Sequence, residues 1–473
     1  MRDRRATPPP RRLQVPRLTS LITAAGLLLA ACPPTSAQDW SCSYGAASSS
    51  ARRPSQGGSE ILHLVGHGQR LFAAVGFWED GTNVYYGGKD PRRGWARVIR
   101  LDAPGGAWEV DLELGPGHVR PEILEAVTFH SDGEGQALDE PVTLLMACAY
   151  ATGLRGTAVH CFVREQDGEG WAKVRVLSGP RGRSEAYSVR DVHVHRDAVT
   201  GVDHVILSIG TQGILTGVYD PDAPGRIAWQ GKPEFGPLQV RPLGITTANG
   251  TLYFSAGNRI YRRVDGPKPR YEVAHDLSDL TTKVRSDVGG VRGLTAVATP
   301  GDEGESLLFM WSPDARAQGE MIRLDPAEGG RFTRHREVVL AELIQTHTGA
   351  SKVQYVLGAY NQMLEVGAGT PDASRRLVGL EFQGSGEGLA QWKRGFYRGA
   401  LYAIRDADRA YRIEEVGGAG GRPLVATRCY VRSPFEGDRA TYFGGHDPNG
   451  IPSTGMAWVH RREDPPASSE RED

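Results

Sequence analysis

The sequence predicts a single seven-bladed β-propeller, because short motifs of one kind recur along the chain at the spacing of one blade. The motifs begin at residues 60, 120, 190, 241, 292, 352 and 422, so consecutive motifs lie 51 to 70 residues apart. Four short strands with their loops need a segment of this size. Six and eight blades are the alternatives.

The motifs share a position at the start of an expected innermost strand. Five carry an arginine: Val119-Arg120-Pro121, Val189-Arg190-Asp191, Val240-Arg241-Pro242, Val291-Arg292-Gly293 and Gly421-Arg422-Pro423. Two weaker members fill the gaps, Ser59-Glu60-Ile61 and Lys352-Val353-Gln354.

Each repeat then shows the same order of elements. An apolar strand follows the motif, as at 123–127, and a second strand follows a turn, as at 71–75, 251–254 and 306–310. An outer hairpin comes next, with Asp, Gly or Pro in its turn and an aromatic residue beyond it, at 98–108, 260–267 and 321–332. These turn residues and the period-2 alternation are typical of β-hairpins. Residues 336–344 are the only segment whose pattern predicts a short helix.

The last two repeats depart from this order. Residues 352–421 offer additional strands at 377–382 and 400–413. The seventh repeat holds three expected strands, at 424–431, 440–443 and 456–459, and a strand near 40–45 would complete its sheet. We therefore expect the N-terminal strand to close the propeller, with a Cys42–Cys429 disulfide fixing that closure.

The first 31 residues are predicted to be an export signal. Six arginines precede an apolar stretch from Leu21 to Ala31, the order expected of a signal peptide. The stretch ends in Leu29-Ala30-Ala31-Cys32, which resembles the lipobox of bacterial lipoproteins. The resemblance implies a lipid on Cys32 and a location in the bacterial cell envelope. Cleavage after Ala37, giving a soluble periplasmic or secreted protein, is the alternative.

The remaining domain boundaries follow from composition. Residues 32–58 are rich in Pro, Ser, Ala and Gly, as expected of a tether, 59–463 form the propeller, and 464–473 form a polar tail predicted to be disordered. No apolar run reaches the length of a transmembrane helix. Without the signal, 49 basic residues stand against 55 acidic ones, a balance that argues against nucleic acid as a partner.

Cys148 and Cys161 form a second candidate disulfide. They lie at equal distances from the turn at Leu154-Arg155, so a hairpin places them opposite each other. A cross-strand bridge is geometrically demanding, and two small buried thiols are the alternative.

The basic residues of the motifs form the first candidate ligand site. If every innermost strand begins on the same face, their side chains surround one mouth of the channel; they are Arg120, Arg190, Arg241, Arg292, Lys352 and Arg422. Converging guanidinium groups bind carboxylates, phosphates or sulfates. The alternative is structural, with each arginine bound to a carbonyl or an acidic residue of the neighbouring blade.

A candidate metal site lies in the segment from 191 to 197. Asp191, His193, His195 and Asp197 alternate along one strand and share a face, and imidazoles with carboxylates suit Zn²⁺ or another divalent metal. The same alternation is typical of any half-exposed strand.

The propeller resemblance is generic. The chain has no Trp-Asp repeat endings, no kelch double-glycine pattern and no complete sialidase Asp-box, so no catalytic residues are carried over from a family. The sequence favours a binding or scaffold protein of the cell envelope whose partner is a protein, a glycan or a small anionic molecule. The alternative is a propeller enzyme, a hydrolase, lyase or dehydrogenase, acting on an anionic carbohydrate-like substrate.

Overall fold

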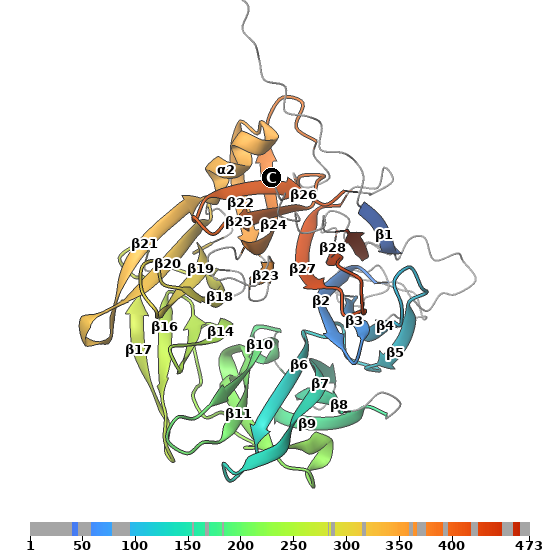
Figure 1. Ribbon diagram of the computed structural model, residues 1–473, viewed down its shortest axis with the longest axis vertical. Coiled ribbons are helices and arrows are strands. Elements are labelled where there is room, and N and C mark those ends of the chain that lie inside the picture. Colours follow the sequence, from blue (N-terminus) through green and yellow to red (C-terminus); the bar gives the residue numbers. More distant parts are fainter. Residues whose placement is uncertain are drawn as a thin grey trace, which may run out of the picture. The chain divides into compact units, whose positions relative to one another are not determined.

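The computed structural model confirms the all-β propeller, with sheets arranged around a common centre (Figure 1). The structure describes residues 40–45, 58–77, 95–153, 156–165, 170–181, 184–281, 283–284, 289–314, 318–358, 363–366, 375–390, 396–417, 424–446 and 457–463, all within the compact unit Ala37–Asp473. The predicted signal segment, Cys32 and residues 464–473 lie outside the described residues.

Four sheets each contain four antiparallel strands in sequence order, and the first strand of each lies nearest the centre in Figure 1. Their strands are β6 (Ile123–Ser131), β7 (Ala137–Gly153), β8 (Gly156–Arg164) and β9 (Ala172–Gly179); β10 (Val189–Arg196), β11 (Asp203–Ile209), β12 (Gly213–Tyr219) and β13 (Ile227–Trp229); β14 (Pro242–Ala248), β15 (Thr251–Ala256), β16 (Arg259–Val264) and β17 (Arg270–Asp276); and β18 (Gly290–Ala298), β19 (Glu305–Ser312), β20 (Glu320–Ala327) and β21 (Arg331–Val339).

The other strands form one 13-stranded sheet. They are β1 (Trp40–Gly45), β2 (Glu60–His67), β3 (Arg70–Gly76), β4 (Arg97–Leu101), β5 (Glu109–Glu113), β22 (Lys352–Gly358), β23 (Leu364–Val366), β24 (Arg375–Ser385), β25 (Leu401–Arg405), β26 (Tyr411–Glu415), β27 (Ala426–Arg432), β28 (Thr441–His446) and β29 (Trp458–Arg462). Single residue pairs, Leu401 with Ala426 and Glu60 with His446, join β25 to β27 and β28 to β2. Because these pairs merge what the repeats predict as separate blades, the count of seven stays a prediction.

The predicted closure by the N-terminal strand is confirmed. β1 pairs antiparallel with β29, which continues the order β27–β28–β29. The Trp40 ring lies 5.0 Å from the Phe443 ring, and Trp108 Nε1 donates to Ser43 Oγ at 3.1 Å. Residues 40–45 are therefore part of a sheet and not of the predicted tether.

The predicted Cys42–Cys429 disulfide is wrong. Neither thiol is part of a disulfide, and Cys42 lies on β1 while Cys429 lies on β27, with β29 and β28 between them. Three strand spacings amount to about 14 Å, whereas a disulfide joins Cα atoms roughly 4.4 to 6.8 Å apart.

The hairpin that carries Cys148 and Cys161 has the predicted register. The two residues are directly paired between β7 and β8, and their buried sulfur atoms lie 2.9 Å apart as free thiols. The structure thus shows the alternative of two buried thiols, and the bond between them stays a prediction.

Side chains alternate along the inner strands between two neighbouring sheets. In β6, Ile123, Val127 and Phe129 pack toward the sheet β10–β13. Leu124 and Ala126 pack with residues of β2 and β3 on the other side. Because a propeller packs sheets face to face, both faces of such a strand are apolar, and a charged residue within it is conspicuous.

Several inner strands begin with a β-bulge, in which one extra residue interrupts the pairing with the next strand. The register shifts lie between Val189 and Asp191 in β10, and between Thr427 and Cys429 in β27. The extra residues there are Arg190 and Arg428. Comparable shifts occur near the start of β2, β14, β18 and β22.

Helices play a minor part among the described residues. α1 (Ser184–Tyr187) is a single turn, and α2 (Leu340–Thr348) lies between β21 and β22. The helix predicted at 336–344 is thus shifted, because residues 336–339 complete the pairing of β21 with β20. α2 ends at Gly349, whose left-handed backbone (φ 71°) lets its N–H bond to the Gln345 carbonyl. Within the described part of the chain, no helix has the length and hydropathy needed to cross a membrane.

Candidate functional site

The arginines predicted at the channel mouth are buried near the starts of the inner strands. Arg120, Arg190, Arg241 and Arg292 are between 3 and 6% exposed. Lys352 is exposed, and Arg422 lies outside the described residues. Arg428, which the sequence analysis did not single out, is also buried, at the bulge of β27.

Buried carboxylates from neighbouring elements accompany these arginines. The Arg120 Nε lies 3.2 Å from the Glu60 carboxylate, and Arg428 Nη2 lies 3.5 Å from that of Glu381. Burial raises the pKa of Glu122. The positive charges of three arginines lower it, and their effects decrease in the order Arg190, Arg120, Arg241. Glu60 is on β2 and Glu381 on β24, so each named ion pair joins adjacent elements of the ring. These contacts favour the structural alternative, and anion binding by this set stays a prediction.

The four residues of the candidate metal site lie on and just after β10, and residues of the neighbouring sheet β14–β17 are their partners; His193 Nε2 and His195 Nδ1 both contact Thr247 Oγ1. Asp191 Oδ2 accepts from the Ile245 N–H at 2.6 Å, and His193 Nε2 lies 2.9 Å from Thr247 Oγ1. His195 Nε2 lies 3.1 Å from the Asp265 carboxylate.

Asp197 and His195 belong to one cluster, because Arg263 binds both Asp197 and the Asp265 carboxylate that contacts His195. Burial opposes the ionisation of Asp197, but the hydrogen bond from Arg263 and three backbone N–H groups hold its pKa well below the usual range. No set of three or more metal-ligating side chains converges anywhere in the described residues. The metal-site prediction is therefore wrong for these four residues, because hydrogen bonds and ion pairs with the neighbouring sheet β14–β17 hold their polar atoms.

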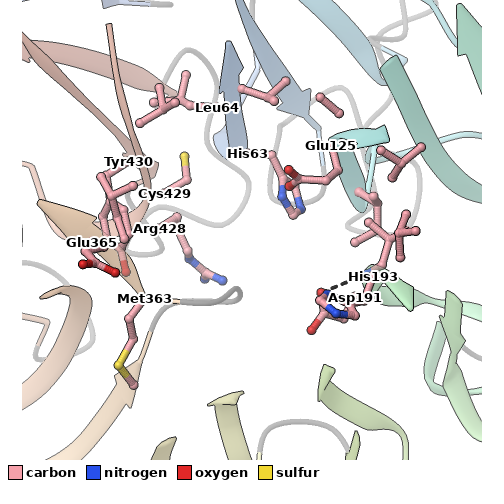
Figure 2. A pocket seen from close by; sticks show the side chains of 18 of the residues that line it. His63, Leu64, Glu125, Asp191, His193, Met363, Glu365, Arg428, Cys429 and Tyr430 are labelled. Atoms are coloured by element: carbon pink, nitrogen blue, oxygen red, sulfur yellow. Dashed lines mark hydrogen bonds between the residues drawn. The ribbon is translucent and has the colours of Figure 1, made fainter. Parts of the chain in front are cut away.

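A cavity of about 530 Å³ opens at the inner strands β2, β6, β10 and β27 and the segment Met363–Glu365. Figure 2 shows that His63 and Glu125 project toward its centre, that Arg428 projects from β27, and that Asp191 and His193 lie on the wall formed by β10. Pockets of roughly 300 to 1,000 Å³ are typical of small-molecule sites. The cavity is thus large enough for a ligand of the size of a sugar or an amino acid.

Two carboxyl groups that line this cavity, those of Glu125 and Asp191, have pKa values above their usual range. The side chain of Glu125 is exposed to solvent inside the cavity. The surrounding cavity wall nevertheless desolvates its carboxyl, and this burial raises its pKa to about 7. Burial also raises the pKa of Asp191 to about 7, and the charge of the nearby Glu125 raises it further. Near neutral pH each group can therefore donate or accept a proton.

The two imidazoles in the same wall are neutral. Burial, with the charges of Arg120 and Arg190, lowers the pKa of His63 to about 4. Burial and the neighbouring His195 lower that of His193 to about 4. His63 Nε2 donates to the Glu122 carbonyl at 2.7 Å, so the neutral ring presents Nδ1 as its acceptor nitrogen.

Sequence reasoning identified part of this cavity and missed the rest. Asp191 and His193 were found, although as metal ligands. Glu125 was missed within the apolar strand 123–127, where a lone carboxyl among buried aliphatic residues is the signal that points to it. Arg428 was missed because it follows Thr427 and is therefore not part of a Val-Arg motif. Its equivalence to Arg190 is visible only in the structure, where each is the extra residue of a β-bulge, in β27 and β10.

The solved structures that resemble this chain share little sequence with it and superpose only loosely. The α-L-arabinofuranosidase Arb93A from Fusarium graminearum, in complex with an iminosugar inhibitor, is 9% identical, with 85% of this chain and 93% of that chain covered and a TM-score of 0.39. A mutant of the lectin AAL from Aleuria aurantia, in complex with Fucα1-6GlcNAc, is 13% identical, with 77 and 97% covered and a TM-score of 0.34. The WD40 domain of SCAP from fission yeast is 7% identical, with 86 and 95% covered and a TM-score of 0.35.

No protein-family model matches the sequence, and no curated protein matches it. Likeness at these identities and TM-scores says nothing of what this chain binds.

Proposed function

We propose that this chain is an exported, lipid-anchored β-propeller that binds a small polar molecule in its central cavity. Export and anchoring rest on the sequence of residues 1–32. Binding rests on one observation, the 530 Å³ cavity in which three carboxyls, two neutral imidazoles and a guanidinium group line a common space.

The composition of the cavity wall supports binding over a purely structural role. A scaffold gains nothing from two carboxyls whose pKa values are raised by burial, because burying charges without a counter-ion costs folding free energy. A ligand that satisfies them recovers this free energy on binding. The ion pairs of Arg120 with Glu60 and of Arg428 with Glu381 help to fix the inner strands that form the cavity wall.

The binding proposal is tested by thermal melting of the mature domain against a panel of sugars, uronic acids, amino sugars, amino acids and dicarboxylic acids. One compound class is expected to raise the melting temperature. Val431→Trp places an indole in the cavity wall and should abolish the rise.

Arg432→Trp is the matched control, since Arg432 is the exposed neighbour on β27 and does not line the cavity. It should keep the ligand-dependent rise. A rise that survives Val431→Trp, or no rise with any compound, contradicts binding in this cavity.

A second candidate function, acid–base catalysis, is favoured by the neighbouring Glu125 and Asp191. Since each has a pKa of about 7, one can be protonated while the other is ionised, as a hydrolase of a carbohydrate-like substrate requires. Release of 4-nitrophenol from 4-nitrophenyl glycosides and glycuronides measures this activity. Catalysis requires turnover that Glu125→Gln lowers at least 100-fold; absence of turnover leaves the chain a binding protein.

A further inference from the structure

The charges around the cavity are unevenly compensated. The guanidinium of Arg428 has the Glu381 carboxylate 3.5 Å away, and the carboxylate of Glu365 has Arg376 Nη2 at 2.8 Å. Among the described residues, no ion pair is formed by Glu125 or Asp191. The cavity therefore presents two carboxyls without a protein counter-ion.

Asp191 is held in place by backbone groups alone. Its Oδ1 accepts from the Val192 N–H at 2.9 Å and its Oδ2 from the Ile245 N–H at 2.6 Å. The residue is only 7% exposed, yet it lines the cavity, as Figure 2 shows. These two hydrogen bonds orient the carboxyl but supply no unit of positive charge.

The other titratable groups that face the pair supply no counter-ion either. His63 on β2 and His193 on β10 are neutral at pH 7, since both have a pKa of about 4. Glu365 on β23 is negative and Arg428 on β27 is matched by Glu381. Because both groups have a pKa of about 7, the two carboxyls together carry about one proton near neutral pH.

Resting on the proposed binding function, we propose that the ligand of this cavity carries a protonated amine that binds the carboxylates of Glu125 and Asp191. The ammonium N–H groups donate to both carboxylates, and the proton that the two groups carry is released. The only bond broken is the carboxyl O–H bond, and water or buffer accepts the proton. The ligand class is thus a small amine with further polar groups, such as an amino sugar or a diamine, in contrast to the anion expected from the arginines.

The test compares compounds of one skeleton and different charge by titration calorimetry at pH 7. Glucosamine, glucose and glucuronate form one series, and putrescine, 1,4-butanediol and succinate form the other. The amine of at least one series should bind 10-fold or more tightly than its neutral and anionic counterparts. Titrations in phosphate and in Tris at the same pH should show release of about one proton per amine bound.

Glu125→Gln removes one carboxylate, so it should weaken amine binding about 10-fold and lower the proton release to half or less, because burial still raises the pKa of Asp191. Glu140→Gln, an exposed change on the adjacent strand β7, should leave the binding within twofold and the proton release unchanged. Asp191→Asn is the second cavity variant, and circular dichroism establishes that each variant is folded.

Tighter binding of glucuronate or succinate, or amine binding without proton release, overturns the charge assignment and leaves binding in the cavity intact. If none of the six compounds binds and no compound of the wider panel stabilises the domain, the proposed function itself is wrong, and the charge assignment is wrong with it.

Discussion

At the scale of single residues, the cavity combines groups whose titrations oppose each other. A carboxyl whose pKa is raised in the folded state makes the protein less stable as pH rises from about 4, its unfolded value, to about 7. An imidazole whose pKa is lowered to about 4 makes the protein less stable as pH falls from about 6.5 to 4. Glu125 and Asp191 belong to the first kind and His63 and His193 to the second.

Glu125→Gln should therefore raise the melting temperature of the mature domain at pH 8 and leave it unchanged at pH 4.5. At pH 8 the wild-type carboxyl is ionised at a cost that the amide avoids, whereas at pH 4.5 both side chains are uncharged in the folded state. The expected rise at pH 8 is about 1 to 3 °C, as befits a partly exposed group. Differential scanning calorimetry at the two pH values measures it, and an equal shift at both would contradict the raised pKa.

At the scale of elements, ion clusters join the sheets away from the centre. Arg263 on β16 lies 2.7 Å from Asp197, which follows β10, and 2.9 Å from Glu234, which follows β13, and all three side chains are buried. Glu337 on β21 binds Arg405 on β25 at 2.7 Å, and it also receives the Tyr411 hydroxyl at 2.6 Å. Such clusters explain why charged residues of the candidate metal site proved structural.

Replacing Arg263 by Met should destabilise the domain by about 3 to 5 kcal/mol, because buried carboxylates lose their only guanidinium partner among the described residues. Arg262→Met is the matched control on the same strand, since Arg262 pairs with Glu272 at the surface. Its effect should stay below about 1 kcal/mol. Urea unfolding monitored by tryptophan fluorescence gives both values; equal effects would show that the cluster is not a major source of stability.

The sequence predicted most of these elements, since turn residues and alternating apolar positions act locally. It placed the strands at 71–75, 123–127, 251–254 and 306–310 within observed strands. It could not place the β-bulges, which arise where the inner strands meet around the centre. A bulge rotates the following side chains, and this rotation decides whether an arginine faces a carboxylate or the cavity.

At the scale of the whole molecule, the first described strand closes the structure. β1 is the fourth strand beside β27, β28 and β29. Trp40 packs against Phe443, and the guanidinium of Arg462 lies over the Trp40 ring. The contact spans most of the chain in sequence, so closure couples the stability of the two ends.

Trp40→Ala should lower the stability of the domain by about 2 to 4 kcal/mol, because it removes a partly buried indole from this closure. Ser41→Ala, at the exposed neighbouring position, should change it by less than about 0.5 kcal/mol. Chemical unfolding of the two variants provides the comparison. An unaffected Trp40→Ala protein would mean that β1 contributes little to closure.

The proposed export and lipid anchoring concern the chain as a whole. Cys32→Ser should remove the lipid and move the protein from the detergent phase to the aqueous phase in Triton X-114 partitioning. Unchanged partitioning would contradict the lipoprotein assignment. Ser36→Ala, near the alternative cleavage point, is the control and should remain in the detergent phase.

The sequence by itself determined the all-β class, the order of the strands and the role of residues 40–45, since these depend on local periodicity and on how many strands each repeat lacks. Tertiary structure alone decided the fate of the charged residues. Whether Arg120 faces Glu60, whether Asp197 faces Arg263 and whether Glu125 and Asp191 line one cavity depends on residues far apart in the sequence. The free energy of a buried charge is set by such distant neighbours, so no local pattern could reveal it.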